Sequence, residues 1–178
     1  MTQAGPDVSA RLAWPDDAAA IVRVQLASWR ENPLIPFDDL EAVDPSELTE
    51  QWVSAISRPN DARMRVLVAL ERADLRGFAL VHPSFDPDSD RVADGEVGEF
   101  VVASEHQRAG HGSRLLQAAM DTLAADKFTR AVWWVDATDD VLRAFVTESG
   151  WEADGAHREL GSETGATIKQ VRLHTSLA

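Results

Sequence analysis

The chain has 178 residues, of which 44% are hydrophobic and 26% charged, and these values are typical of a globular protein that buries its own core. Its formal net charge of -13 argues against nucleic acid or an anionic membrane surface as the main partner. There is no cysteine, which excludes disulfides, thiolate metal sites and cysteine nucleophiles, and the five histidines lack metal-site spacing, so we expect no metal cofactor.

The first residues, MTQAGPDVSA, have neither the basic start nor the apolar segment of a secretory signal. No apolar stretch approaches the roughly 20 residues that span a bilayer. We therefore expect a cytoplasmic protein without a membrane partner. Residues 1–178 show no repeat or linker and are expected to form a single domain, with residues 1–9 as a flexible leader.

The first third of the chain predicts one strand and two helices. SARLAW (9–14) alternates weakly and is typical of a strand, and residues 15–30 carry apolar side chains at helical spacing. Residues 31–43 contain two prolines and several acids and are expected to form a loop. Residues 44–57 predict a second helix, capped by Asp44.

Extended segments follow. Residues 63–71 and 75–82 predict an antiparallel hairpin, 83–95 an acidic loop rich in turn formers, and 96–103 another strand.

Helices and strands then alternate to the end of the chain. We expect a helix over 113–126, a strand over 130–137, a helix over 139–149, and a final hairpin from 151–160 and 166–176. This order indicates a mixed α/β (α+β) fold.

A glycine-rich stretch, HQRAGHGSRLL (106–116), joins the strand at 96–103 to the helix that follows. Such a turn leaves backbone N–H groups at the helix N-terminus without protein partners, where the helix dipole favours an anion. Gly110 and Gly112 would let a phosphate approach these amides closely. The stretch lacks the third glycine of a dinucleotide fingerprint and the lysine of a P-loop. The alternative is a plain tight connection.

This stretch resembles the acyl-CoA-binding motif of the GNAT superfamily of N-acyltransferases, [QR]-x-x-G-x-[GA], which Gln107, Gly110 and Gly112 match. DDVLRAFVTESGW (139–151) resembles the later family helix that ends in G-[FW], and residues 24–45 resemble the opening helix and loop of a bacterial branch. The resemblance covers nearly the whole chain. It implies a twisted, mostly antiparallel sheet of about seven strands, splayed between strands 4 and 5 and flanked by about four helices.

The resemblance also implies acetyl-CoA, or another acyl-CoA, as the acyl donor. Its pyrophosphate would lie on the glycine stretch, where His111 either touches phosphate or is exposed. Val101 and Val102 on the splayed strand would offer backbone groups to the pantetheine arm and the thioester carbonyl, and Asp139 stands where an asparagine often contacts that arm. The residues implied at the pyrophosphate are Gln107, Arg108, Ala109, Gly110, His111, Gly112 and Ser113.

Transfer to an amine requires a general base, because the amine is usually protonated at neutral pH. Glu96 matches the glutamate that recurs at this distance before the glycine motif in the family, although a solvated or salt-bridged carboxylate is the alternative. The odd separation of Glu96 and Glu99 places them on opposite faces of a regular strand, so Glu99 is expected to be structural or to line the acceptor cleft.

The general acid of the family has no counterpart here. Family members commonly carry a tyrosine four residues before the G-[FW] pair, where this chain has Val146, and the chain contains no tyrosine. A thiolate with a pKa near 8.5 leaves tolerably well without an acid. The competing hypothesis is therefore a non-catalytic acyl-CoA-binding or regulatory module.

The acceptor is expected to be a primary amine of a small molecule or a peptide. His82 either reaches the acceptor cleft from the end of its strand or lies on the surface, and Trp29 either lines the acceptor pocket or belongs to the core. Family members often form homodimers, and this sequence leaves that open.

Overall fold

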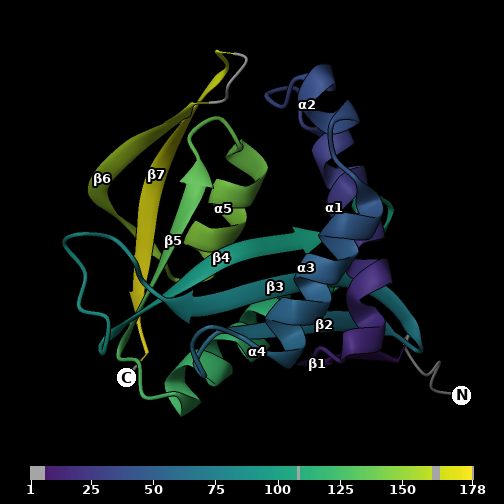
Figure 1. Cartoon of the computed structure of the whole chain (residues 1–178). Helices are drawn as coiled ribbons and strands as arrows, with labels where there is room; N and C mark the ends of the chain where they lie inside the picture. Colours follow the sequence, from purple (N-terminus) through teal and green to yellow (C-terminus); the bar gives the residue numbers. More distant parts are fainter. Residues whose placement is uncertain (1–6, 108, 162–164, 178) are drawn as a thin grey trace, which may run out of the picture.

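One seven-stranded sheet, with helices on both faces, forms the centre of the computed structural model, which describes residues 7–107, 109–161 and 165–177 (Figure 1). The strands are β1 (Val8–Leu12), β2 (Arg65–Glu71), β3 (Asp74–Pro83), β4 (Asp94–Val102), β5 (Arg130–Asp136), β6 (Glu152–Gly161) and β7 (Thr167–Ser176). The helices are α1 (Ala18–Glu31), α2 (Phe37–Glu41), α3 (Pro45–Ser57), α4 (His111–Ala125) and α5 (Asp140–Glu148), with short 3-10 turns η1 (Pro15–Asp17) and η2 (Ser104–His106).

The sheet divides between its fourth and fifth strands. The strand order is β1-β2-β3-β4-β5-β7-β6, and all neighbours are antiparallel except β4 and β5. These two strands pair only from Asp94, opposite Arg130, to Val97, opposite Trp133, and then diverge. The predicted mixed sheet, splayed between strands 4 and 5, is therefore confirmed.

Two hydrophobic cores cover the two faces of the sheet. On one face, α1 and α3 pack on β2 and β3 through the buried Ile21, Trp52 and Phe78. On the other face, α4 buries Leu115 and Leu123, which have the helical spacing that the sequence shows. Each face of the sheet thus has its own helical layer.

The helix boundaries depart from the expectations at two places. Residues 37–41, expected in a loop, form α2. Asp38 and Asp39 lie in its first turn, where their negative charge interacts favourably with the positive end of the helix dipole and stabilises the helix. The described part of the chain therefore has five α-helices, where about four were expected. Helix α4 begins at His111, two residues early, which places Gly112 in its first turn.

The expected leader over residues 1–9 is wrong at its end, because Val8 and Ser9 belong to β1 and pair with Glu71 and Leu70; residues 1–6 lie outside the described part of the chain. Asp44 caps α3 by accepting a hydrogen bond from the Ser46 N–H. Over the part of the chain described, no helix is long and apolar enough to cross a bilayer.

Candidate functional site

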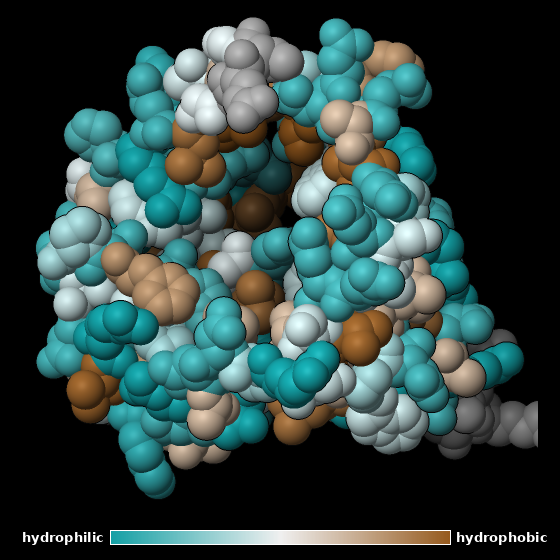
Figure 2. Space-filling view, viewed as in Figure 1, coloured by the Kyte–Doolittle hydropathy of each residue, from teal (hydrophilic) through white to brown (hydrophobic). Residues whose placement is uncertain are grey.

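The divergence of β4 from β5 opens a cleft between two parts of the molecule. Figure 2 shows a hollow at this place, with hydrophobic side chains at its floor and both hydrophobic and hydrophilic ones around it. The outer end of the cleft holds a cavity of about 140 Å³ between the α1–α2 loop and the tips of β6 and β7, lined by Ile35, Leu160 and Ile168 among others. A second cavity of about 130 Å³ lies between α1 and residues 102–107, next to the glycine stretch.

The N-terminus of α4 is open to an anion. Gly110 precedes the helix with φ +89, in the left-handed region, and no side chain of the residues that the structure describes caps the helix there. The first helical hydrogen bond runs from the Arg114 N–H to the Gly110 carbonyl, so the amides of residues 111–113 have no partner within the helix. A Cβ built on Gly110 would meet nothing within 4 Å among the described residues, so the space beside this glycine is open. The arrangement fits a pyrophosphate.

The flanking residues of the motif differ in what they offer. The Gln107 side-chain amide donates to the Val102 carbonyl at 3.3 Å and ties the glycine stretch to the end of β4. Ala109 is exposed, as are Gly110 and Ser113. Arg108 lies outside the described residues.

His111 departs from both side-chain expectations, because its side chain is buried beneath α4 with 1% exposure. Neither ring nitrogen has a hydrogen-bond partner among the described residues, and burial lowers the pKa of the imidazole. The expectation of an exposed side chain is wrong, and a side-chain contact with phosphate is not available in this position. What His111 presents to a ligand is its backbone N–H.

The backbone of β4 alternates between β3 and the gap. The Ala103 N–H donates to the Arg76 carbonyl beside β3, so one residue earlier the peptide groups of Val102 point the opposite way, toward the open edge. By the same alternation the backbone groups of Val101 face β3. Only Val102 of the predicted pair therefore directs its backbone into the gap.

A β-bulge brings the two glutamates of β4 to one face. Val81 lies opposite Val97 and Leu80 opposite Glu99, so Gly98 is an extra residue without a partner. His82 lies opposite Glu96, and because His82 and Leu80 share a face of β3, Glu96 and Glu99 also share that face. The expectation of opposite faces is wrong for this reason.

His82 lies beside Glu96 with a defined ring orientation. Its Nδ1 lies 2.7 Å from the Pro83 carbonyl oxygen, which can only accept, so Nδ1 donates and Nε2 carries the lone pair in the neutral ring. The ring stacks on Phe85 at 4.9 Å between centroids. A Cβ on Gly98 would lie 2.5 Å from Nε2, so the absence of a side chain at the bulge makes room for the imidazole.

Both glutamates have raised pKa values. Burial is the largest influence on the pKa of Glu96; the nearby Asp86 raises it further, whereas His82, Arg158 and Ser84 lower it. Burial also raises the pKa of Glu99, against the lowering effect of a hydrogen bond from the Gln25 amide, which donates to the Glu99 carboxylate at 2.8 Å. The Gln25 oxygen in turn accepts from the Trp52 indole N–H at 2.9 Å, so the core of the α1–α3 layer fixes Glu99.

Two further expected site residues, and the position of the family's missing acid, have structural roles. Trp29 packs against the α1–α3 core, in line with its core alternative. Asp139 caps α5 by accepting from the Leu142 N–H at 3.0 Å, so its carboxylate already has a partner. Val146 is fully buried in the α4 face core, so the position at which the family has its acid does not line the cleft.

Sequence reasoning missed Gln25, Ser84 and Asp86 as neighbours of the glutamates. The signal that could have revealed the bulge is Gly98 itself, an isolated glycine inside a strand. Within the described parts of the chain, no group of three or more histidine, aspartate and glutamate side chains could hold a metal ion.

Comparison with known proteins gives a family and a set of similar folds. A model of the acetyltransferase (GNAT) family matches residues 24–151, well over half of the chain. A search of curated protein sequences finds no match.

Three solved structures illustrate the similarity of the fold. The Staphylococcus aureus Mu50 N-acetyltransferase has a TM-score of 0.77 at 15% identity, over 97% of this chain and 99% of that one. The Brucella melitensis ribosomal-protein-alanine N-acetyltransferase has a TM-score of 0.75 at 21% identity, over 94% and 98%. The Salmonella typhimurium protein yncA, solved with acetyl-CoA, has a TM-score of 0.74 at 19% identity, over 96% and 94%. At these identities the likeness establishes the fold alone.

Proposed function

The chain belongs to the GNAT family of acetyltransferases, whose acyl donor is acetyl-CoA, and we propose that it transfers the acetyl group to a primary amine of a small molecule or a peptide. The observation that carries the proposal is the position of Glu96 and His82. Both lie on one face of the sheet beside the point where β4 and β5 part, opposite the layer that contains α4.

The seat of the donor is the N-terminus of α4. Its uncapped amides at residues 111–113 would bind the pyrophosphate, supported by the helix dipole and by the space that Gly110 leaves open. The Val102 N–H at the open edge of β4 would bind the pantetheine arm, since the Val102 carbonyl already accepts from Gln107. The donor supplies an acetyl group activated as a thioester, and the protein binds both substrates and removes the proton of the acceptor.

Glu96 is the proposed proton acceptor. Its raised pKa makes its carboxylate a stronger base than that of an exposed glutamate, and it would take a proton from the acceptor's ammonium group, directly or through water. His82 and Glu99 on the same face would bind and orient the acceptor. The freed amine attacks the thioester carbon and the C–N bond forms; the nitrogen then releases its second proton to water, the C–S bond breaks, and CoA leaves as the thiolate.

Direct transfer forms no covalent intermediate with the protein, so it needs no nucleophilic side chain. This is consistent with a chain that has no cysteine. The acid step needs no dedicated residue either, because a thiol with a pKa near 8.5 is a fair leaving group. The buried Val146 nevertheless supports a second candidate, a module of the same fold that binds acyl-CoA without catalysis.

A CoA-release assay separates the two candidates. The protein is incubated with acetyl-CoA and a panel of small primary amines and short peptides with free N-termini, and products are identified by mass spectrometry. Release of CoA together with an N-acetylated amine supports the transferase. Acetyl-CoA binding by calorimetry without turnover of any amine would favour the binding module, and no binding at all would remove the donor site at α4.

A further inference from the structure

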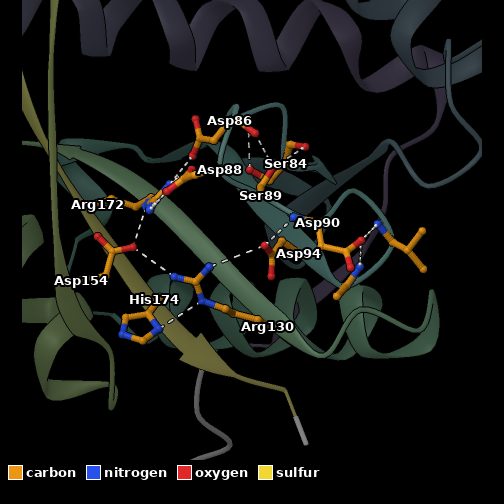
Figure 3. Close-up of polar contacts among 12 residues, drawn as sticks. Ser84, Asp86, Asp88, Ser89, Asp90, Asp94, Arg130, Asp154, Arg172 and His174 are labelled. Atoms are coloured by element: carbon orange, nitrogen blue, oxygen red, sulfur yellow. Dashed lines mark hydrogen bonds and ion pairs between the residues drawn. The ribbon is translucent and has the colours of Figure 1, made fainter.

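A buried arginine links the two parts of the divided sheet. Arg172 on β7 has a side chain only 8% exposed, and it donates to three carboxylates: Asp86 at 3.0 Å, Asp88 at 2.8 and 2.7 Å, and Asp154 at 2.6 Å (Figure 3). We call Arg172 with these three aspartates the Arg172 clamp. A buried charge destabilises the fold unless its hydrogen-bond and ion-pair partners compensate for the lost water. The three aspartates of the clamp provide this compensation for Arg172.

The clamp lies at the start of the gap. Asp86 and Asp88 belong to the loop between β3 and β4, on one side of the division, whereas Arg172 and Asp154 belong to β7 and β6 on the other. Arg172 lies opposite Trp134, the first residue of β5 beyond its last pair with β4. The Trp134 indole N–H also donates to Asp86 at 2.9 Å, so β5 supports the same contact.

Both ends of the loop are fixed to this network. Asp154 also accepts from Arg130 at 3.0 Å, and Arg130 lies 3.6 Å from Asp94, at the end of the loop (Figure 3). The Ser84 N–H, at its beginning, donates to the Asp94 carbonyl at 2.8 Å. Hydrogen bonds from the Ser89 N–H and hydroxyl to the Asp86 carbonyl close the turn between Asp86 and Ser89.

The clamped loop continues directly into the groups proposed for proton removal. Ser84, which is fully buried, lowers the pKa of Glu96, and Phe85 stacks on His82. Asp86 follows at once and is held by Arg172. Three consecutive residues therefore connect the clamp to Glu96 and His82.

We propose that Arg172 is a positioning residue for proton removal: by binding Asp86 and Asp88 it holds residues 84–86 against Glu96 and His82 at the start of the gap. The inference rests on the proposed function, in which Glu96 is the base. It assigns to a residue 76 positions away in sequence the task of keeping the base in place, and it explains why a charge is buried there.

The charges of the clamp also affect the pKa of Glu96. The charged and titratable groups acting on Glu96 are His82 from β3, Asp86 from the loop and Arg158 from β6. Asp86 opposes the charge of Glu96, and Arg172 partly neutralises Asp86. Arg172→Gln should therefore raise the pKa of Glu96, whereas Asp86→Asn should lower it, although both variants open the same clamp.

The test compares Arg172→Gln and Asp86→Asn with wild type and with Arg65→Gln. The control removes a paired arginine on the opposite face of the sheet from Glu96 and His82: Arg65 lies opposite Val81 and bonds Asp126, at the end of α4, at 2.6 and 2.8 Å. In the apo protein, amide exchange over residues 84–94 should be faster in both clamp variants, and the midpoint of the Glu96 carboxyl ¹³C titration should move up in Arg172→Gln and down in Asp86→Asn. With the best amine of the panel, kcat should fall about 10- to 100-fold in both.

Clamp variants that fold and match Arg65→Gln in exchange, titration midpoint and kcat would overturn the inference. If loss of the buried arginine prevents folding, Asp88→Asn replaces Arg172→Gln in the test, because the Asp88 side chain is 64% exposed and its substitution is tolerated more easily. Asp88→Asn should speed amide exchange of the loop and lower kcat. Wild-type values of both would again overturn the inference. Glu96→Gln is measured alongside. Full activity of Glu96→Gln removes the proposed base, whereas a slow Glu96→Gln beside unaffected clamp variants removes only the role of Arg172.

Discussion

Glu96 shows how a group suited to chemistry can weaken the fold that carries it. Burial raises its pKa above the ordinary value of 4.5, so its charged form is less stable in the folded protein than in the unfolded chain. A group with a raised folded pKa stabilises the fold only while it is protonated. This contribution is complete below pH 4.5 and is lost as the pH rises through the folded pKa.

Glu96→Gln, which is neutral at every pH, should therefore raise the thermal midpoint of unfolding at pH 7 relative to wild type. The gain should shrink on acidification and disappear below the ordinary glutamate pKa of 4.5. Thermal unfolding of both proteins between pH 4 and pH 8 measures this difference. A midpoint difference that is independent of pH would show that the charge of Glu96 is not the cause.

Val146 is a packing residue at a position where the resemblance suggested an acid. It is fully buried, and the Trp151 N–H donates to its carbonyl, so the turn that carries the G-[FW] pair folds directly over it. Val146→Tyr should overpack this core and destabilise the protein by about 1–3 kcal/mol without raising kcat. Denaturant unfolding and the CoA-release assay check both; an equally stable variant with higher kcat would mean that the position reaches the cleft.

At the scale of the element, the start of α4 contains two glycines, Gly110 and Gly112, that differ in backbone conformation and surroundings. Gly110 adopts φ +89, where alanine costs about 1–2 kcal/mol, and a Cβ there would occupy open space next to the start of the helix. Gly112 is helical, and a Cβ there would make ordinary contact with Phe145 at 3.5 Å. The two positions are therefore a matched pair.

Gly110→Ala should lower both stability and acetyl-CoA affinity. Gly112→Ala should keep the affinity close to wild type, as the family motif allows alanine there, and should gain up to about 1 kcal/mol of stability from the helix. Calorimetry with acetyl-CoA and thermal unfolding measure both quantities. Equal affinities for the two variants would argue against the pyrophosphate seat.

Sequence patterns predicted the regular elements well because each depends on local spacing. The stripe of α4 and the cap of α3 were read from neighbours within a few residues, and the structure has both. Helix α2 was missed because five residues after Pro36 carry too short a pattern to reveal a helical period. The bulge at Gly98 was missed because counting alternate residues assumes a regular strand, and one extra residue reverses the side of Glu99.

At the scale of the whole molecule, the fold class followed from element order, but the site did not follow from it entirely. The final hairpin was predicted from local patterns. The strand order within the sheet, with β7 beside β5 and β6 at the edge, is determined by tertiary packing. The Arg172 clamp depends on that order, because it brings Arg172 to Asp86, 86 residues away. No local pattern in the sequence pairs these residues.

The excess of acidic residues acts on the molecule as a whole. With a formal net charge of -13, the folded protein repels itself, and salt screens this repulsion more than it screens the buried pairs of the clamp. Raising NaCl from about 10 to about 150 mM, which shortens the Debye length from about 30 to about 8 Å, should raise the midpoint of thermal unfolding at pH 7. A falling midpoint would mean that ion pairs such as Arg172–Asp88 outweigh the repulsion.

The pH dependence of CoA release, measured for wild type and Glu96→Gln with the same amine, tests most directly the central claim that Glu96 removes the acceptor's proton beside the splayed strands. We expect Glu96→Gln to be slower by about 10²- to 10⁴-fold at pH values below the pKa of the amine, with the difference narrowing as the free amine becomes abundant. Two profiles that run parallel, or that coincide, would contradict the claim.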